Sequence, residues 1–180
     1  MNRNTRKVAA MGMLCALAYG AAALGRVPLV LFLKYDPKDV VIALGGMIFG
    51  PFSALLIAVA VSFVEMLSVS GTGIWGLVMN VVSSASFACT AALIHRKKGG
   101  YAGAAAGLFC GWACMVLSMM FWNYLITPLH MGYPREAVAE LLIPVFLPFN
   151  LLKGGLNTGI TLVLYKPVVS TLGHSFPVGR

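Results

Sequence analysis

Long apolar segments separated by short polar turns are the feature of this 180-residue chain that most restricts its fold. Hydrophobic residues make up 59% of the sequence and charged residues only 10%, whereas soluble domains carry about 25% charged residues. A soluble fold of this composition has too few charges to cover its surface. The sequence therefore predicts an all-α integral membrane protein.

The apolar segments predict a six-transmembrane-helix bundle, since a helix needs roughly 20 residues to cross a bilayer. The expected helices cover residues 8–25, 40–49, 52–70, 76–94, 101–126 and 138–165. The second is too short to cross unless it borrows flanking residues. No signal-peptide cleavage site follows the first segment, so it is expected to stay as a helix. The whole chain, 1–180, is expected to form a single membrane domain.

The distribution of charge predicts which side of the membrane each loop occupies. The chain has 13 Lys and Arg residues against 5 Asp and Glu residues, a net charge of +8. With the amino terminus inside, most basic residues fall on the cytoplasmic side, as such residues usually do. These are Arg3, Arg6, Lys7, Arg96, Lys97, Lys98, Lys166 and Arg180. Both termini are therefore predicted to be cytoplasmic.

Nucleic-acid binding is not expected from this positive charge, because the sequence shows no basic face with interleaved aromatic residues.

Lys153 stands out because it lies inside one of the most apolar regions, in the polar sequence FNLLKGGLN (149–157). A cation at membrane depth costs about 2.5 to 3.5 kcal/mol on insertion scales, so it usually faces a cavity or a ligand. Asn150 lies three residues earlier, on the same helical face. This pair suggests that the chain holds a polar molecule within the membrane.

Other polar and aromatic residues are expected at the outer ends of the helices, where they could share one outward pocket. The candidates are the amides Asn80 and Asn123 and the aromatic residues Trp75, Trp122, Tyr124 and Phe149. Amides both donate and accept hydrogen bonds, and aromatic rings offer flat faces. Such a pocket suits a planar ring with a polyhydroxy or amide tail. The alternative is that each asparagine only bonds a neighbouring helix.

The outer loop 26–39 is both apolar and charged, and it ends in the sequence LKYDPKD (33–39). We interpret this loop, which contains Tyr35 and Asp39, as a substrate lid. The alternative is a re-entrant or interfacial segment that only caps the bundle. Glu65, in the third helix, could pair with Lys153, relay protons or face the outer end of the bundle. We expect its carboxylate to be half solvated.

Small residues recur every four positions along the first helix. Gly12, Ala16 and Gly20 form one row, and Ala18 and Ala22 form another. Rows of this kind let a second helix approach closely within a membrane. The first row could serve a partner protein or ordinary packing inside the bundle.

Catalytic and metal-binding motifs are not evident, and we predict that the chain is not an enzyme. No nucleophile elbow, zinc-protease motif, paired-carboxylate motif or nucleotide-binding loop is present. The four cysteines lack metal-ligand spacing, and no metal site is expected. Uphill transport would therefore need an ion gradient or a partner that hydrolyses ATP.

Several short motifs, taken in order, carry a resemblance to a known family. They are LKYDPKD (33–39), GGMIFGP (45–51), GTG (71–73) with Met79-Asn80, WNY (122–124) with Thr127-Pro128, and PFNLLKG (148–154). In this combination the chain resembles the substrate-binding S components of energy-coupling factor (ECF) transporters. It is most similar to the riboflavin-specific branch, and the likeness covers nearly the whole chain.

The resemblance implies a multi-pass protein of a prokaryotic plasma membrane that captures a vitamin from outside. It implies docking through Gly12, Ala16 and Gly20 on a transmembrane coupling subunit that carries two ATPase subunits. In this family the S component is thought to topple in the membrane to release its substrate. The protein would need no cofactor of its own, because riboflavin is the transported ligand and its partners use the ATP.

The resemblance also implies roles for individual residues. Asn123, Asn150 and Lys153 would hydrogen-bond the flavin or its ribityl chain, Asn80 would line the pocket, and the loop through Tyr35 and Asp39 would close it. Glu65 departs from the pattern, because many riboflavin binders are expected to have a lysine there. The alternatives are an S component for a different vitamin, an ion-coupled secondary carrier for a small polar solute, and a structural membrane subunit.

Overall fold

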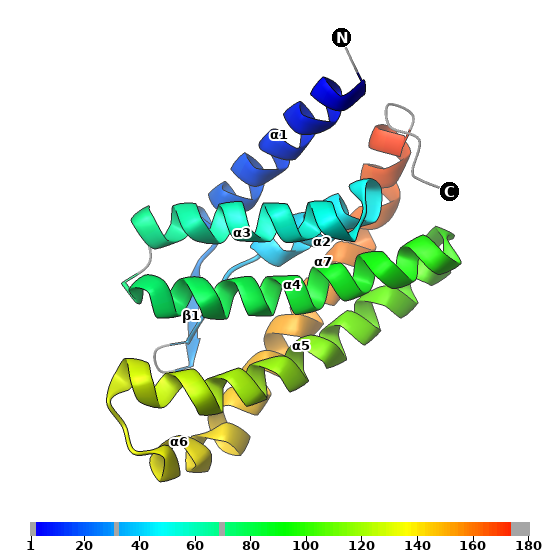
Figure 1. The fold of residues 1–180 in the computed structure, drawn as a ribbon. Coiled ribbons are helices and arrows are strands. Elements are labelled where there is room, and N and C mark those ends of the chain that lie inside the picture. Colours follow the sequence, from blue (N-terminus) through cyan, green and yellow to red (C-terminus); the bar gives the residue numbers. More distant parts are fainter. Residues whose placement is uncertain (1–2, 31–32, 69–70, 174–180) are drawn as a thin grey trace.

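The structure is a computed structural model that describes residues 3–30, 33–68 and 71–173, and it shows a bundle of helices with one small hairpin (Figure 1). In chain order the elements are α1 (Arg3–Leu24), β1 (Val27–Val30), β2 (Leu33–Tyr35), α2 (Lys38–Phe49), α3 (Pro51–Ser68), α4 (Gly73–Lys98), α5 (Gly100–Met131), α6 (Arg135–Leu141), the π-helical turn η1 (Leu142–Phe146) and α7 (Leu147–Gly173). Residues 69 and 70 of the third predicted helix lie outside the described residues.

The distribution of polarity is that of a membrane protein. Within the described residues, five helices are long and apolar enough to cross a bilayer, the last of them formed by α6, η1 and α7 together. Large apolar side chains such as Leu117 and Val163 lie on the outer surface, while Lys38, Asp39 and Glu65 are fully buried. The predicted bundle of membrane-spanning helices is confirmed for these five helices. The number of six spans stays a prediction, because α2 has only 12 residues.

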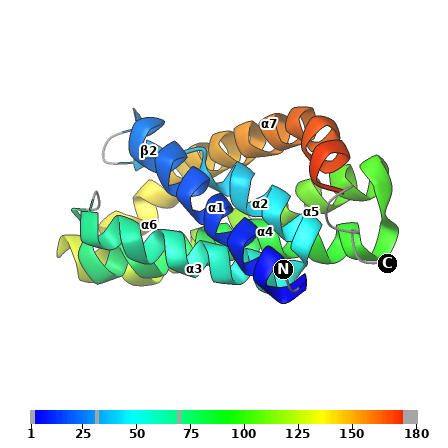
Figure 2. The same cartoon turned by 90° about the horizontal axis from the view of Figure 1, so that it is seen from above.

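The short helix α2 lies at the centre of the bundle, where it packs against α1, α3, α4 and α7 (Figures 1 and 2). Nearly all of its residues are buried, including Ile42, Ala43 and Met47. Helix α2 begins soon after the hairpin, and the two charged residues at its start, Lys38 and Asp39, are fully buried. This placement brings Lys38 and Asp39 to the site described below.

Helices α4 and α5 make the most extensive helix–helix contact in the bundle; they pack together near the turn that joins them and diverge toward their other ends (Figure 1). Two glycines of α5 make this approach possible. A Cβ atom at Gly107 would lie 2.5 Å from the carbonyl oxygen of Ala91, and one at Gly111 would lie 2.4 Å from that of Phe87. Small residues on such an interface let two backbones come together where lipid offers no hydrophobic driving force.

Two features differ from the sequence-based prediction. The all-helical prediction missed the hairpin of β1 and β2, which pair antiparallel with Val27 opposite Tyr35. The single helix expected over 138–165 is instead interrupted by η1. Pro144 lies within η1, and Pro148 is the second residue of α7. Proline lacks the N–H of a regular helical turn and its ring crowds the preceding turn, which explains the local change of geometry.

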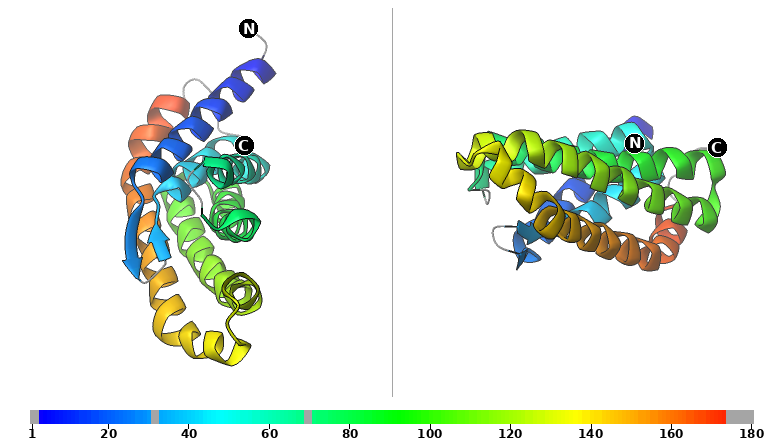
Figure 3. Two further views of the ribbon diagram at one scale, coloured as in Figure 1. Left: turned by 90° about the vertical axis from the view of Figure 1, so that its left-hand side faces the viewer. Right: turned by 90° about the horizontal axis from the view of Figure 1, so that it is seen from below.

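The two small-residue rows of α1 have different surroundings. Ala18 and Ala22 are fully buried against the bundle. Gly12 and Ala16 are exposed, and a Cβ atom at Gly12 or Gly20 would meet no atom within 4 Å. The amino-terminal half of α1 projects away from the other helices (Figure 3). The second row therefore serves internal packing, whereas the first row faces outward.

Candidate ligand-binding site

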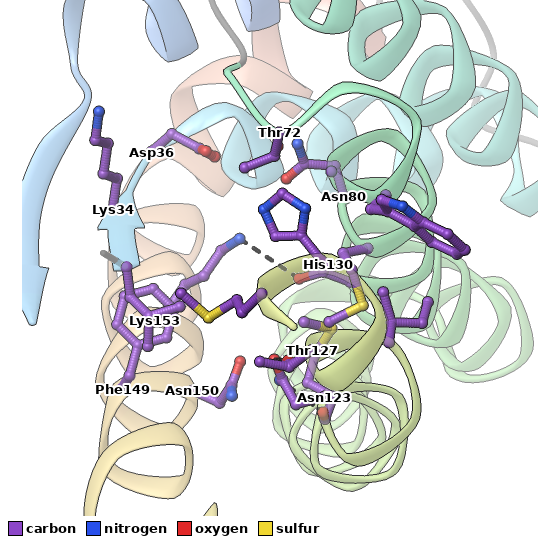
Figure 4. Close-up of a pocket in the computed structure, with 18 of the residues that line it drawn as sticks. Lys34, Asp36, Thr72, Asn80, Asn123, Thr127, His130, Phe149, Asn150 and Lys153 are labelled. Atoms are coloured by element: carbon purple, nitrogen blue, oxygen red, sulfur yellow. Dashed lines mark hydrogen bonds between the residues drawn. The ribbon is translucent and has the colours of Figure 1, made fainter. Parts of the chain in front are cut away.

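A cavity of about 490 Å³ lies between α4, α5, α7 and the segment that carries the hairpin (Figure 4). Its polar lining comprises Arg26, Lys34, Asp36, Thr72, Asn80, Ser83, Asn123, Thr127, His130, Asn150 and Lys153. Its apolar lining includes Leu33, Trp75, Met79, Met119, Ile126, Met131 and Phe149. Cavities of this size, mostly apolar with a few converging polar groups, typically hold a small molecule.

The cavity brings together most of the residues that the sequence singled out. Those that line it are Trp75, Asn80, Asn123, Thr127, Phe149, Asn150 and Lys153. Asp39 and Tyr35 are not lining residues: Asp39 forms an ion pair with the lining residue Lys153, and Tyr35 is joined to Asp39 through Asn157. Trp122 and Tyr124 are not among the lining residues, and Tyr124 is 37% exposed.

Lys153 is buried and held in place by two neighbours. Its Nζ lies 3.3 Å from Oδ2 of Asp39 and donates to Oγ of Ser83 at 3.4 Å. Asp39 is fully buried, so the ammonium group is the cation that compensates this carboxylate. Burying either charge alone would be costly, whereas the pair is tolerated because each ion has further hydrogen-bond partners. Lys153 therefore presents a fixed positive group to the cavity.

Asp39 is the centre of a hydrogen-bond network behind the cavity wall. Ser84 donates to its Oδ1, and the Asn157 amide donates to its Oδ2 at 3.2 Å. The Tyr35 hydroxyl donates to Oδ1 of Asn157 at 3.0 Å, which joins the hairpin to α7. Burial raises the pKa of Tyr35, and the Asp39 and Asp36 carboxylates raise it further against a smaller opposing effect of Lys153. Tyr35 therefore stays protonated at neutral pH and remains a donor.

The asparagines on α5 and α7 differ in how far their amides are satisfied. Asn123 donates to the carbonyl oxygen of Met119 at 2.7 Å and accepts from Thr127 at 3.3 Å. Asn150 donates to the carbonyl oxygen of Phe146 at 2.7 Å. Its Oδ1 is buried and has no hydrogen-bond partner within the described residues. An unsatisfied buried acceptor costs about 1 to 3 kcal/mol, so a bound molecule that donates to this oxygen would remove that cost.

The expectation that Glu65 is half solvated is wrong, because this residue is fully buried. It forms an ion pair with Lys38, which is also fully buried, and a second with Nη2 of Arg26 at 3.3 Å. Asn80 donates to its Oε2 at 3.4 Å. Asp36 lies 3.8 Å from both cations. Glu65 thus pairs with residues that flank the hairpin rather than with Lys153.

Sequence reasoning missed His130 and Asn157, although helical spacing offers a signal for both. His130 follows Asn123 by seven residues and so lies on the same face of α5, where it lines the cavity (Figure 4). Asn157 likewise follows Asn150 by seven residues and so lies on the same face of α7. The ion pairs of Lys38 and Arg26 had no such signal, since their partner lies on a different helix.

The chemistry of the cavity is that of binding. It offers an ammonium group, amide donors and acceptors, and flat or flexible apolar walls. Within the described residues, no group of three or more His, Cys, Asp or Glu side chains could hold a metal ion.

The fold is similar to two solved structures of S components. With the S component of a bacterial ECF transporter, the TM-score is 0.80 at 23% identity, and the match covers 94% of this chain and 99% of that one. With the S component for biotin from an ECF-type ABC transporter, the TM-score is 0.59 at 14% identity, covering 92% and 95%. At these identities the likeness establishes the fold alone.

Similarity in sequence identifies the family. The chain is 25% identical over 144 residues to the riboflavin transporter FmnP of Bacillus subtilis (strain 168), a match that covers 74% of this chain and 75% of that protein. The family model for the substrate-specific component of ECF transporters matches residues 6–165. The resemblance found in the sequence motifs is thereby confirmed, and the chain belongs to the family of substrate-specific components of ECF transporters.

Proposed function

We propose that this protein is a riboflavin-binding S component that captures the vitamin from outside a prokaryotic cell and delivers it with an ECF coupling module. Two observations support riboflavin as the ligand. The relative from Bacillus subtilis is a riboflavin transporter, and the cavity combines flat apolar walls with a cluster of fixed polar groups.

The observation that carries the proposal is the unsatisfied Oδ1 of Asn150 in the wall that also presents Lys153. Asn150 can accept a hydrogen bond from a ligand, and the Lys153 ammonium group, which has three donors, can donate one. Riboflavin has both kinds of group, since its ring system carries an imide N–H between two carbonyl groups and its ribityl chain carries hydroxyls. Asn80 on α4 and Asn123 on α5 supply further amides.

The apolar lining is consistent with a planar ring. Trp75 and Phe149 offer aromatic faces, and Met79, Met119 and Met131 offer flexible, polarizable side chains that adapt to a ring edge. Side chains of these kinds suit a flat tricyclic ring. The alternative is an S component for a different vitamin, for which the solved biotin component provides a precedent within the same fold.

In the proposed orientation both termini are cytoplasmic and α2 completes six spans, so that the cavity opens outward. The segment 26–39 acts as a lid over the ligand, with Tyr35 and Asp39 fixing it to the wall behind. The outward row of Gly12, Ala16 and Gly20 docks on the transmembrane coupling subunit, and two ATPase subunits provide the energy. The protein itself uses no cofactor.

The proposal is tested by purifying the full chain in detergent from cells grown with riboflavin and recording its absorbance spectrum. Bound flavin gives a yellow protein with about one flavin per chain. A colourless protein that also fails to bind added riboflavin would contradict the assignment. Uptake by the chain alone in ATP-free liposomes with an imposed ion gradient would instead favour a secondary carrier.

A further inference from the structure

Glu65 holds together parts of the chain that the cavity needs in fixed positions. Its carboxylate is fully buried on α3 and contacts three side chains from three other segments. Arg26 precedes β1, Lys38 begins α2, and Asn80 lies on α4 in the cavity wall. One carboxylate therefore bridges both ends of the hairpin segment and one wall of the site.

The hairpin depends on such anchors for its position. Its two strands have four and three residues, and an isolated hairpin of this length is marginal at best in water. Leu33, Lys34 and Asp36 of this segment nevertheless line the cavity. Arg26 and Lys38 flank the hairpin, and both form ion pairs with the buried carboxylate of Glu65. These two ion pairs hold the ends of the hairpin segment together. Tyr35 adds a separate contact to α7 through Asn157.

The contact with Asn80 sets the direction of an amide in the site. Since the carboxylate of Glu65 can only accept, the Asn80 amide must turn its Nδ2 toward it, and Oδ1 is left as the acceptor of that side chain. Figure 4 shows Asn80 beside His130 and Thr72. An acceptor fixed in this way selects for a donor on the ligand.

We propose that Glu65 is the positioning residue of the binding site, which keeps the hairpin segment over the cavity and fixes the orientation of Asn80. This inference rests on the proposed function for its meaning in ligand binding. Its structural part, the anchoring of the hairpin, can be measured without any ligand.

The test compares purified wild-type protein with Glu65→Gln, which keeps the shape of the side chain and removes its charge. Glu140→Gln is the matched control, because Glu140 is an exposed glutamate on α6. In hydrogen–deuterium exchange without ligand, hairpin amides of Glu65→Gln should exchange at least about tenfold faster, while amides at the α4–α5 interface keep the wild-type rate. Unchanged hairpin exchange, or equally faster exchange throughout the chain, would overturn the proposal.

A second variant covers the case in which Glu65→Gln does not fold because the fully buried Lys38 keeps only the more distant Asp36, at 3.8 Å, as its ion-pair partner. In Glu65→Gln/Lys38→Met both Glu65 and Lys38 lose their charge, and Asp36 keeps Arg26 as its partner. Hairpin amides should again exchange at least about tenfold faster than in the wild type. If the hairpin amides of this variant were as well protected as in the wild type, the ion pairs of Glu65 would not be what positions the hairpin.

Ligand kinetics separate this inference from the proposed function. If the wild type binds riboflavin, dissociation from Glu65→Gln should be at least about tenfold faster, measured by stopped-flow recovery of flavin fluorescence. A mere loss of folded protein would lower the amplitude and leave this rate unchanged. If the wild type binds no riboflavin, the proposed function fails, and the exchange experiment still decides the role of Glu65.

Discussion

At the scale of single residues, the main finding is that ionic side chains are buried in a chain that crosses a membrane. Asp39, Lys38 and Glu65 are fully buried, and each has an ion-pair partner. Replacing one partner of a buried pair leaves an uncompensated charge, which costs about 3 to 5 kcal/mol. The pairs therefore make the interior sensitive to mutations that change a single charge.

Lys153→Met should both destabilise the protein and abolish tight riboflavin binding. Asp39 keeps Ser84 and Asn157 as donors but loses its cation, so we expect the free energy of unfolding to fall by about 3 kcal/mol. Thermal unfolding and flavin-fluorescence titration measure the two effects. In the double variant Asp39→Asn/Lys153→Met, stability should recover while binding stays lost. Recovery of binding in that variant would show that Lys153 does not contact the ligand.

Asn150→Leu should separate binding from stability. The ligand-free protein loses a buried, unsatisfied acceptor, so its unfolding temperature should stay close to that of the wild type or rise. Riboflavin affinity should fall roughly 5- to 150-fold, because the ligand donor is left without a partner at a cost of about 1 to 3 kcal/mol. Equal affinity of the variant and the wild type, measured by fluorescence titration, would rule out Asn150 as a ligand contact.

Sequence reasoning located Lys153 and Asn150 because a polar pair in an apolar helix stands out by itself. It misjudged Glu65, whose surroundings depend on Arg26 and Lys38, 39 and 27 residues away along the chain. Helical spacing reveals which residues share a face of one helix. It does not reveal which side chain of another helix meets that face.

At the scale of elements, tight packing between helices rests on a few positions without side chains. A Cβ atom at Gly111 would lie 2.4 Å from the carbonyl oxygen of Phe87, whereas one at Gly159 would meet no atom within 4 Å. Both residues lie in regular helix. They therefore form a matched pair for testing the α4–α5 interface.

Gly111→Ala should destabilise the protein by about 1 to 3 kcal/mol, because α4 and α5 must separate to admit the methyl group. Gly159→Ala should be neutral or stabilising by up to about 1 kcal/mol, since alanine favours helix. Thermal unfolding of the two variants in the same detergent checks this difference. Equal stability would mean that the helices of the protein do not pack this closely.

The sequence predicted most of the helices but neither the hairpin of β1 and β2 nor the π-helical turn η1. Long apolar segments predicted most helix positions, because each segment must satisfy its backbone within the membrane. The hairpin was missed since β1 and β2 are short and their pairing depends on anchors at Arg26, Tyr35 and Lys38. The π-helical turn at Pro144 was missed because a proline within an apolar run does not reveal whether the helix ends or continues after a bend.

At the scale of the whole molecule, α1 presents one row of small residues to the bundle and another to its surroundings. Ala16→Leu is expected to leave riboflavin affinity and thermal stability unchanged, because Ala16 is exposed. It should weaken co-purification with the transmembrane coupling subunit by at least about tenfold, since a large side chain prevents close helix approach. Gly159→Leu on α7 is the control for an added outward leucine. Normal assembly of Ala16→Leu would argue against docking through this row.

A fluorescence-quenching titration of the purified, ligand-free protein measures whether the cavity between α4, α5 and α7 binds riboflavin. We expect saturable quenching with one site per chain, no competition by biotin, and loss of quenching in Lys153→Met/Asp39→Asn. Absence of quenching by the folded wild-type protein, or quenching that persists unchanged in that double variant, would contradict the assignment of this ligand to this cavity.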